Sequence, residues 1–219
     1  MISNENIGPE FLIPLVDFER IHKVINTIIR NEGSIPEQSC ILFSIYGAEI
    51  LSEHYGINAN VCTGVAAYNI EGNPVFWGKM VSDCLISNKD AYHSWIEAEG
   101  FVIDFMAPFL PKLIQMQQEH FCQKINPVQP KMFQRKLLNM CKPTLDLSSK
   151  NDFFLIKNNE LLERLLDDNS NAGFEYFKKV ASDNYQRPPK IMGDKISVED
   201  KNLNVIDVPL VGAKLVGSW

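Results

Sequence analysis

The stretch that decides the fold runs from His93 to Asp104 and reads HSWIEAEGFVID. Two runs rich in aromatic and β-branched residues flank the pair Glu99-Gly100, which is a turn signal. The stretch therefore predicts a β-hairpin with arms over 94–97 and 101–104.

The register of this hairpin decides which side chains share a face. In a ladder closed by an even-numbered loop, two residues whose numbers sum to an odd value lie on the same face. His93 and Asp104 satisfy this rule. A loop at Ala98-Glu99 places them directly opposite, and a loop at Glu99-Gly100 makes them diagonal neighbours within hydrogen-bond reach. A bulge or a three-residue loop would separate them. The apolar residues that this register turns to the opposite face, toward a core, are Ile96, Phe101, Ile103 and Phe105.

Two helices are expected before this hairpin. Apolar residues at helical spacing predict a helix over 18–31, and a second helix ends before Gly56. Its start has two interpretations: Ser34 has capping-box spacing to Glu37, and Ser39 is a later alternative. A start at Ser39 puts Cys40 in the first turn, whereas a start at Ser34 puts it nearly two turns in, where the helix dipole has faded.

The remaining patterns complete the order of elements. Strands are expected over 60–68 and 74–78, around a turn at 72–73, and helices over 110–121, 131–140, 160–167 and 172–185. Residues 205–219 predict one or two short strands, and 151–155 offers another. This order indicates an α+β protein with a core over 1–110 and a mainly helical C-terminal extension over 111–219, packed on the same core.

Composition excludes several classes of protein. The 219 residues are 45% hydrophobic, enough for one sizeable core, and the net charge of −6 with scattered acidic residues argues against nucleic-acid binding. No basic start with an apolar run and no stretch of bilayer length is present, so we expect a cytoplasmic protein with no membrane partner. The five cysteines form no CxxC pair, which favours free thiols. His54, His120 and Cys122 lack a third ligand at a recognised spacing, so we expect neither a metal nor another cofactor.

Cys40, His93 and Asp104 together predict nucleophilic chemistry. A thiol attacks as the thiolate, which a helix N-terminus stabilises, and Cys40 is the one cysteine placed that way. An imidazole that accepts the thiol proton and a carboxylate that orients the imidazole complete a triad.

These residues resemble the transglutaminase-like branch of the papain-like cysteine proteinase superfamily. The likeness lies in the cysteine helix over 39–49, the stretch 56–64, and the two hairpin arms, and it covers about 35–108. The resemblance implies a papain-like fold in which the nucleophile helix packs on the antiparallel sheet. It assigns Cys40 as the nucleophile, His93 as the general base and acid, and Asp104 as the orienting group.

The resemblance also indicates where an oxyanion would be held. The backbone N–H of Cys40 is one donor. Papain-type enzymes carry a glutamine six residues before the cysteine, but that position here is Ser34, and Gln38 is the closer substitute. Trp95, on the face of His93, is the candidate for substrate binding.

The expected activity is acyl chemistry through a thioester on Cys40. Hydrolysis of a peptide or isopeptide bond in a peptide or protein substrate is the first hypothesis. Transfer of the acyl group to an amine, of transglutaminase or N-acetyltransferase type and with small acyl or amine substrates, is mechanistically the same up to the thioester. A binding module that keeps the fold without turnover is the alternative from another class.

Overall fold

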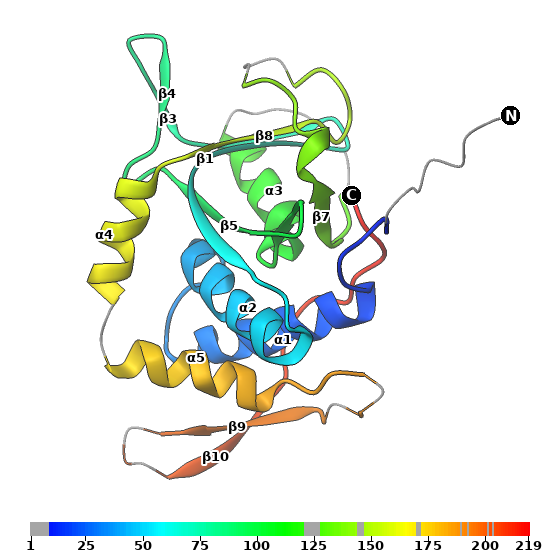
Figure 1. Cartoon of the computed structure of the whole chain (residues 1–219), viewed down its shortest axis with the longest axis vertical. Helices are drawn as coiled ribbons and strands as arrows, with labels where there is room; N and C mark the ends of the chain where they lie inside the picture. Colours follow the sequence, from blue (N-terminus) through cyan, green and yellow to red (C-terminus); the bar gives the residue numbers. More distant parts are fainter. Residues whose placement is uncertain are drawn as a thin grey trace, which may run out of the picture.

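The computed structural model describes residues 9–120, 128–143, 147–169, 172–188, 190–191, 193–200, 202 and 204–219. A curled antiparallel sheet lies in the middle of the molecule, with helices α1 (Leu15–Asn31) and α2 (Cys40–Tyr55) on one face and α3 (Leu110–His120) on the other (Figure 1). The structure is therefore α+β, as the order of sequence patterns predicts.

The two N-terminal helices lie close to their predicted places. Helix α1 (Leu15–Asn31) begins three residues earlier than its apolar pattern, directly after Pro14. Helix α2 (Cys40–Tyr55) follows a 3-10 turn over Pro36–Gln38, so the start at Ser39 is confirmed and the start at Ser34 is wrong. Gly56 ends α2 with a φ of 65°, in the left-handed conformation that glycine adopts at no steric cost.

The main sheet is built around one long strand, β1 (Asn60–Ile70). Strand β5 (His93–Ala98) pairs with residues 60–64 of β1, and strand β2 (Asn73–Trp77) pairs with residues 66–70. Strand β8 (Phe153–Lys157) pairs with residues 64–68 from the opposite side. Strands β2 and β5 therefore share one edge of β1 and diverge between Trp77 and His93. We call this divergence the fork.

The chain leaves the sheet at the fork and returns to it. Strands β3 (Lys79–Val81) and β4 (Cys84–Ile86) form a separate two-stranded hairpin that projects from the body of the molecule (Figure 1). A short loop then leads to His93, the first residue of β5. The histidine thus lies at a strand end, beside an opening in the sheet.

The hairpin of β5 and β6 (Phe101–Asp104) has the predicted two-residue loop. Ile96 pairs with Ile103 and Ala98 with Phe101, which leaves Glu99-Gly100 as the loop. Both loop residues have positive φ, 47° and 81°, as the mirror-image turns of tight hairpins require. Of the alternatives drawn from the sequence, the Glu99-Gly100 loop is therefore the correct one.

The second half of the chain contributes strands as well as helices. Helices α3 (Leu110–His120), α4 (Asn159–Asn169) and α5 (Ala172–Asn184) confirm three predictions, and β8 confirms the strand proposed near residue 151. The hairpin of β9 (Lys195–Glu199) and β10 (Val205–Pro209) lies beyond α5 (Figure 1). Strand β10 and a single bridge between Met132 and Ser218 correspond to the strands expected over 205–219, whereas nothing in the sequence analysis indicated β9.

The helix expected over 131–140 is wrong. These residues form strand β7 (Phe133–Lys136) followed by a 3-10 turn over Leu137–Asn139. Strand β7 extends the sheet beyond β6, and the Gln134 side chain bonds the backbone of Ile13 through both its oxygen and its nitrogen. These long-range bonds override a local helical preference, which is a weak determinant by itself. Residues after 110 thus supply two strands, β7 and β8, to the sheet that the first half begins.

The sheet separates two apolar cores. The first joins α1, α2 and α5 to the sheet residues Ile96, Phe101 and Ile103. The second joins α3 to Trp95, Val102 and residues of β1, β7 and β8 on the opposite face. The predicted alternation along β5 and β6 is therefore confirmed. None of the helices in the described ranges has the length and apolar character needed to cross a bilayer.

Candidate active site

Cys40 is the first residue of α2. Its side chain is 6% exposed, and the preceding Ser39 donates its hydroxyl to the Ile35 carbonyl instead of capping the helix. The positive end of the helix dipole therefore acts at Cys40 without a side-chain cap to neutralise it. The Ser44 hydroxyl donates to the Cys40 carbonyl at 3.0 Å, one turn further on.

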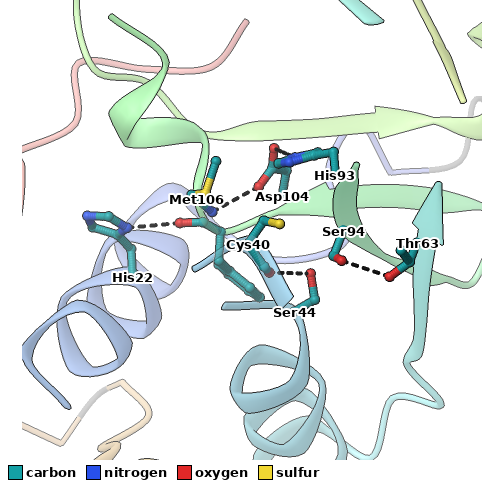
Figure 2. A network of polar contacts seen from close by, with 9 residues as sticks. His22, Cys40, Ser44, Thr63, His93, Ser94, Asp104 and Met106 are labelled. Carbon is teal, nitrogen blue, oxygen red and sulfur yellow. Dashed lines mark hydrogen bonds and ion pairs between the residues drawn. The ribbon is translucent and has the colours of Figure 1, made fainter. Parts of the chain in front are cut away.

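His93 and Asp104 meet as diagonal neighbours on one face of the hairpin. The Nε2 of His93 lies 2.8 Å from Oδ2 of Asp104, and both side chains are buried (Figure 2). A carboxylate oxygen accepts, so Nε2 donates. The second carboxylate oxygen, Oδ1, accepts the backbone N–H of Met106 at 2.9 Å. The carboxylate is thus held at both oxygens.

The other nitrogen of His93 faces the thiol. Nδ1 is buried and makes no hydrogen bond within ordinary limits to any residue the structure describes. Burial by itself lowers the pKa of His93, but the charge and hydrogen bond of Asp104, with a further contribution from Cys40, raise it well above the ordinary value. Figure 2 shows the Cys40 sulfur at the start of α2, on the side of the helix that faces this pair. The structure therefore brings Cys40, His93 and Asp104 together, as the sequence predicts.

Two aromatic side chains enclose the imidazole. Trp77 stacks on the His93 ring with centroids 4.3 Å apart and planes 20° apart, and Tyr68 meets it edge-on at 5.8 Å. Trp77 ends β2 and His93 begins β5, so this stack closes the fork. Burial first, and the nearby Asp104 second, raise the pKa of the Tyr68 hydroxyl well above its ordinary value. Sequence reasoning placed Tyr68 and Trp77 only in strands; their pairing with His93 depends on the fork, which has no sequence signal.

A cavity of about 370 Å³ opens beside the thiol. Gln38, the last residue of the 3-10 turn, lines it together with Cys40, Trp77 and Met106. The charged residues Glu37, Lys89 and Asp90 also line it, and Glu37 pairs with Lys112 at 2.6 Å. Gln38 and the Cys40 thiol therefore lie at the same cavity.

Trp95 does not belong to this cavity. It is fully buried in the core on the α3 side of the sheet, and its indole N–H donates to Glu97 at 3.1 Å. Its assignment to substrate binding is therefore wrong. The sequence correctly placed it on the face of His93, but at Trp95 that face is covered by the core that includes α3.

Tyr92 is a member of the site that the sequence analysis missed. It lines the same cavity as Cys40. Burial, followed by the charge of Cys40 and a hydrogen bond to it, raises the pKa of the Tyr92 hydroxyl above its ordinary value. The Tyr92 phenol and the His93 imidazole therefore both interact with the Cys40 thiol. The available signal was position, since Tyr92 directly precedes His93 in the chain.

The described residues contain no cluster of three or more His, Cys, Asp or Glu side chains that could hold a metal ion. Cys122 and the side chain of His120 lie outside the described residues.

A family model described as "Protein of unknown function (DUF2026)" matches residues 14–219. The chain belongs to the DUF2026 family. A solved structure described as "The crystal structure of genomics APC5867" is similar to this DUF2026 chain at 31% sequence identity. The match covers 97% of this chain and 100% of that chain, with a TM-score of 0.84. A comparison with curated proteins gave no match. That solved structure shares the fold of this DUF2026 protein over nearly its whole length.

Proposed function

We propose that the protein is a thiol-dependent hydrolase that cleaves a peptide or isopeptide bond through a thioester on Cys40. The observation that carries this proposal is the arrangement of His93, whose Nε2 is bound to Asp104 at 2.8 Å while its Nδ1 is left for the thiol. The resemblance to the transglutaminase-like branch of the papain-like superfamily agrees with this arrangement, and a papain-like fold is part of the same proposal.

The first half of the reaction forms the thioester. The Cys40 thiol gives its proton to Nδ1 of His93, and the sulfur attacks the carbonyl carbon of the substrate. The developing oxyanion is bound by the backbone N–H of Cys40 at the start of α2 and by the side-chain amide of Gln38. His93 then passes its proton to the departing amine, and the carbon–nitrogen bond breaks.

The second half of the reaction hydrolyses the thioester and releases the acyl group as a carboxylic acid. Water enters the cavity vacated by the amine, gives a proton to His93, and attacks the thioester carbonyl. The carbon–sulfur bond breaks, and the proton on His93 returns to the sulfur. Throughout, Asp104 keeps the imidazole in the tautomer with the proton on Nε2 and stabilises its charged form, as the raised pKa of His93 indicates.

Tyr92 contributes a further hydrogen bond to the sulfur. A phenol whose pKa is raised stays protonated at neutral pH and donates to the thiolate. We assign it to stabilising the thiolate before attack.

The test is the reactivity of each thiol toward a limiting amount of iodoacetamide, measured by peptide mass spectrometry from about pH 5 to 9. Cys84 is exposed on the β3–β4 hairpin and provides an internal reference in the same molecule. Cys40 should react at least about tenfold faster than Cys84 at pH 6, and His93→Ala should abolish this advantage. A Cys40 that reacts no faster than Cys84 in the wild type would contradict the proposal.

A second experiment shows whether water or an amine accepts the acyl group from the thioester. A peptide library with an added primary amine distinguishes hydrolysis, which gives the free acid, from transfer, which gives the new amide. Transfer would retain the thioester half of the proposal and overturn the hydrolytic half. Binding of a peptide without turnover by a protein whose Cys40 is unreactive would favour the binding module.

A further inference from the structure

His22, on α1, is a fully buried residue that the reaction above does not use. Its Nδ1 lies 2.9 Å from the carbonyl oxygen of Phe105. A carbonyl oxygen only accepts, so Nδ1 carries the proton and donates. The other ring nitrogen, Nε2, is buried and forms no hydrogen bond with any residue in the described part of the chain. The tautomer of His22 is therefore set by the single bond to Phe105.

The peptide group that His22 binds is the one that holds the catalytic carboxylate. The carbonyl of Phe105 and the N–H of Met106 belong to the same planar unit and point in opposite directions. The carbonyl accepts from His22 at 2.9 Å, and the N–H donates to Oδ1 of Asp104 at 2.9 Å (Figure 2). The other oxygen of Asp104 accepts from His93. A continuous chain of hydrogen bonds thus runs from α1 through one peptide group to the triad.

We propose that His22 is a positioning residue for the triad, which fixes and polarises the 105–106 peptide group and through it orients the Asp104 carboxylate toward His93. A donor at the carbonyl oxygen polarises the peptide group and strengthens the bond from its N–H, because linked hydrogen bonds are cooperative in a low-dielectric interior. The inference rests on the proposed function, since it adds a supporting residue to that site.

The surroundings keep His22 neutral and in place. Burial lowers its pKa to about 4, and the charged groups that face it are Lys23 and Glu19 on its own helix and Asp104 on β6. The ring stacks on Phe43 at 5.6 Å and 13°. Phe43 lies one turn after Cys40 on α2. The same imidazole therefore contacts the helix of the nucleophile and the strand end of the carboxylate.

A matched pair of substitutions isolates the hydrogen bond. Asn and Leu have nearly the same shape, and His22→Asn keeps a donor close to the position of Nδ1 while His22→Leu removes it. Both lose the ring, so both lose the same stacking on Phe43. His22→Phe, which keeps a ring and removes the donor, is a second variant without the bond.

The expected result is a difference in the pH profile of Cys40 alkylation. His22→Asn should stay within about threefold of the wild type at pH 6. His22→Leu and His22→Phe should fall by about tenfold, the lower end of the loss that follows when a hydrogen bond supporting a metal ligand is removed. Circular dichroism confirms that each protein is folded. Equal alkylation profiles in folded His22→Leu, His22→Asn and wild type would overturn the inference.

Nitrogen NMR of the unmodified protein tests the same inference without any substitution. His22 should carry its proton on Nδ1 at neutral pH, and a His22 protonated on Nε2 would overturn the inference. The two proposals also fail separately. A slow Cys40 in the wild type removes the proposed function, whereas a fast, His93-dependent Cys40 that ignores His22→Leu removes only the role of His22.

Discussion

The Asp104 carboxylate, to which the proposed function assigns the orienting of His93, accepts one hydrogen bond at each oxygen. Its two oxygens face two donors, Nε2 of His93 and the N–H of Met106. An acceptor at both positions is therefore required, and an ionised carboxylate is the side chain of this size that provides it.

The change Asp104→Asn supplies one acceptor for two donors. Whichever way the new side-chain amide turns, its NH2 group faces the N–H of either His93 or Met106. If His93 instead changes tautomer to accept a hydrogen bond at Nε2, its proton moves to Nδ1, the nitrogen that should receive the thiol proton. We expect Cys40 alkylation at pH 6 to fall by about tenfold or more, measured by the mass-spectrometric assay. Asp83→Asn, in the turn of the projecting hairpin, is the control and should leave the rate unchanged. An unaltered rate in folded Asp104→Asn would show that the carboxylate has no part in activating the thiol.

Glu32, just after α1, has an environment that disfavours its charge. Burial raises its pKa to about 7, and a hydrogen bond from Tyr46 at 3.5 Å offsets only part of this. A carboxyl whose pKa is raised on folding holds a proton that the unfolded chain releases. Its contribution to stability is therefore present below about pH 4.5 and is lost as the pH rises toward 7.

The variant Glu32→Gln should remove that loss. At pH 8 we expect its free energy of unfolding to exceed that of the wild type by about 1–2 kcal/mol, after allowing for solvent screening of a half-buried group. Near pH 4.5 the two proteins should agree within about 0.5 kcal/mol. Urea unfolding at both pH values measures the difference, with Glu53→Gln, on the exposed side of α2, as the control. A gain of equal size at both pH values would contradict the titration of Glu32.

At the scale of elements, the close approach of α2 to the sheet positions Cys40. Gly47 lies two turns into α2, and a Cβ added there would lie 2.4 Å from Cδ2 of Phe105 and 3.0 Å from Cδ1 of Ile96. The absence of a side chain at this position therefore permits the close approach of the helix to Ile96 of β5 and to Phe105, the residue after β6.

Gly47→Ala should move the helix away from the sheet. Alanine favours a helix by about 1 kcal/mol over glycine, but overpacking a core costs about 1–3 kcal/mol, so we expect a net loss of stability. Because Cys40 is on this helix and His93 and Asp104 are on the sheet, Cys40 alkylation at pH 6 should fall as well. Ser52→Ala, on the exposed side of α2, should change neither quantity. A variant more stable than the wild type, with normal alkylation, would mean that the contact is not tight.

Prediction of elements from the sequence succeeded where local signals were consistent. The Glu99-Gly100 loop fixes the register of β5 and β6 through two neighbouring residues, and this register is what places His93 and Asp104 on one face of the hairpin. Prediction failed at residues 133–136, whose pairing with β6 depends on residues far away in the chain. The fork and the stacking of Trp77 on His93 depend likewise on how β1 is shared between strands, which no local pattern records.

At the scale of the whole molecule, the C-terminal stretch ties the first helix to the start of β7, the strand that follows β6 in the sheet. Val211 accepts from Asn26 at 2.7 Å, the N–H of Leu215 donates to Glu19 at 2.9 Å, and Trp219 donates its backbone N–H to Met132 at 3.2 Å. The indole of Trp219 is buried in the core on the α3 side. Parts of the chain about two hundred residues apart are thus joined at one site.

Trp219→Ala should lower the free energy of unfolding by about 3 kcal/mol, the usual cost of removing a buried aromatic side chain. Urea unfolding measures it, and Val216→Ala, at a side chain 59% exposed, should stay within about 0.5 kcal/mol of the wild type. The pH profile of Cys40 alkylation should be unchanged in the folded variant, because Trp219 does not line the cavity. A negligible loss of unfolding free energy would mean that the C-terminal stretch contributes little to the stability of the folded protein.

The fork also separates the segment that lines the cavity from the residues of the proposed triad. Strands β2 and β5 meet the same edge of β1 at adjoining positions, so the segment 78–91 leaves and re-enters the sheet at neighbouring points. Lys89 and Asp90 of this segment line the cavity, whereas the three triad residues lie outside the segment. An exchanged segment of another length or sequence would therefore give the pocket new walls while the reacting groups keep their register. Under the proposed function, deliberate redesign of this loop would therefore change what the pocket recognises while Cys40, His93 and Asp104 stay in place.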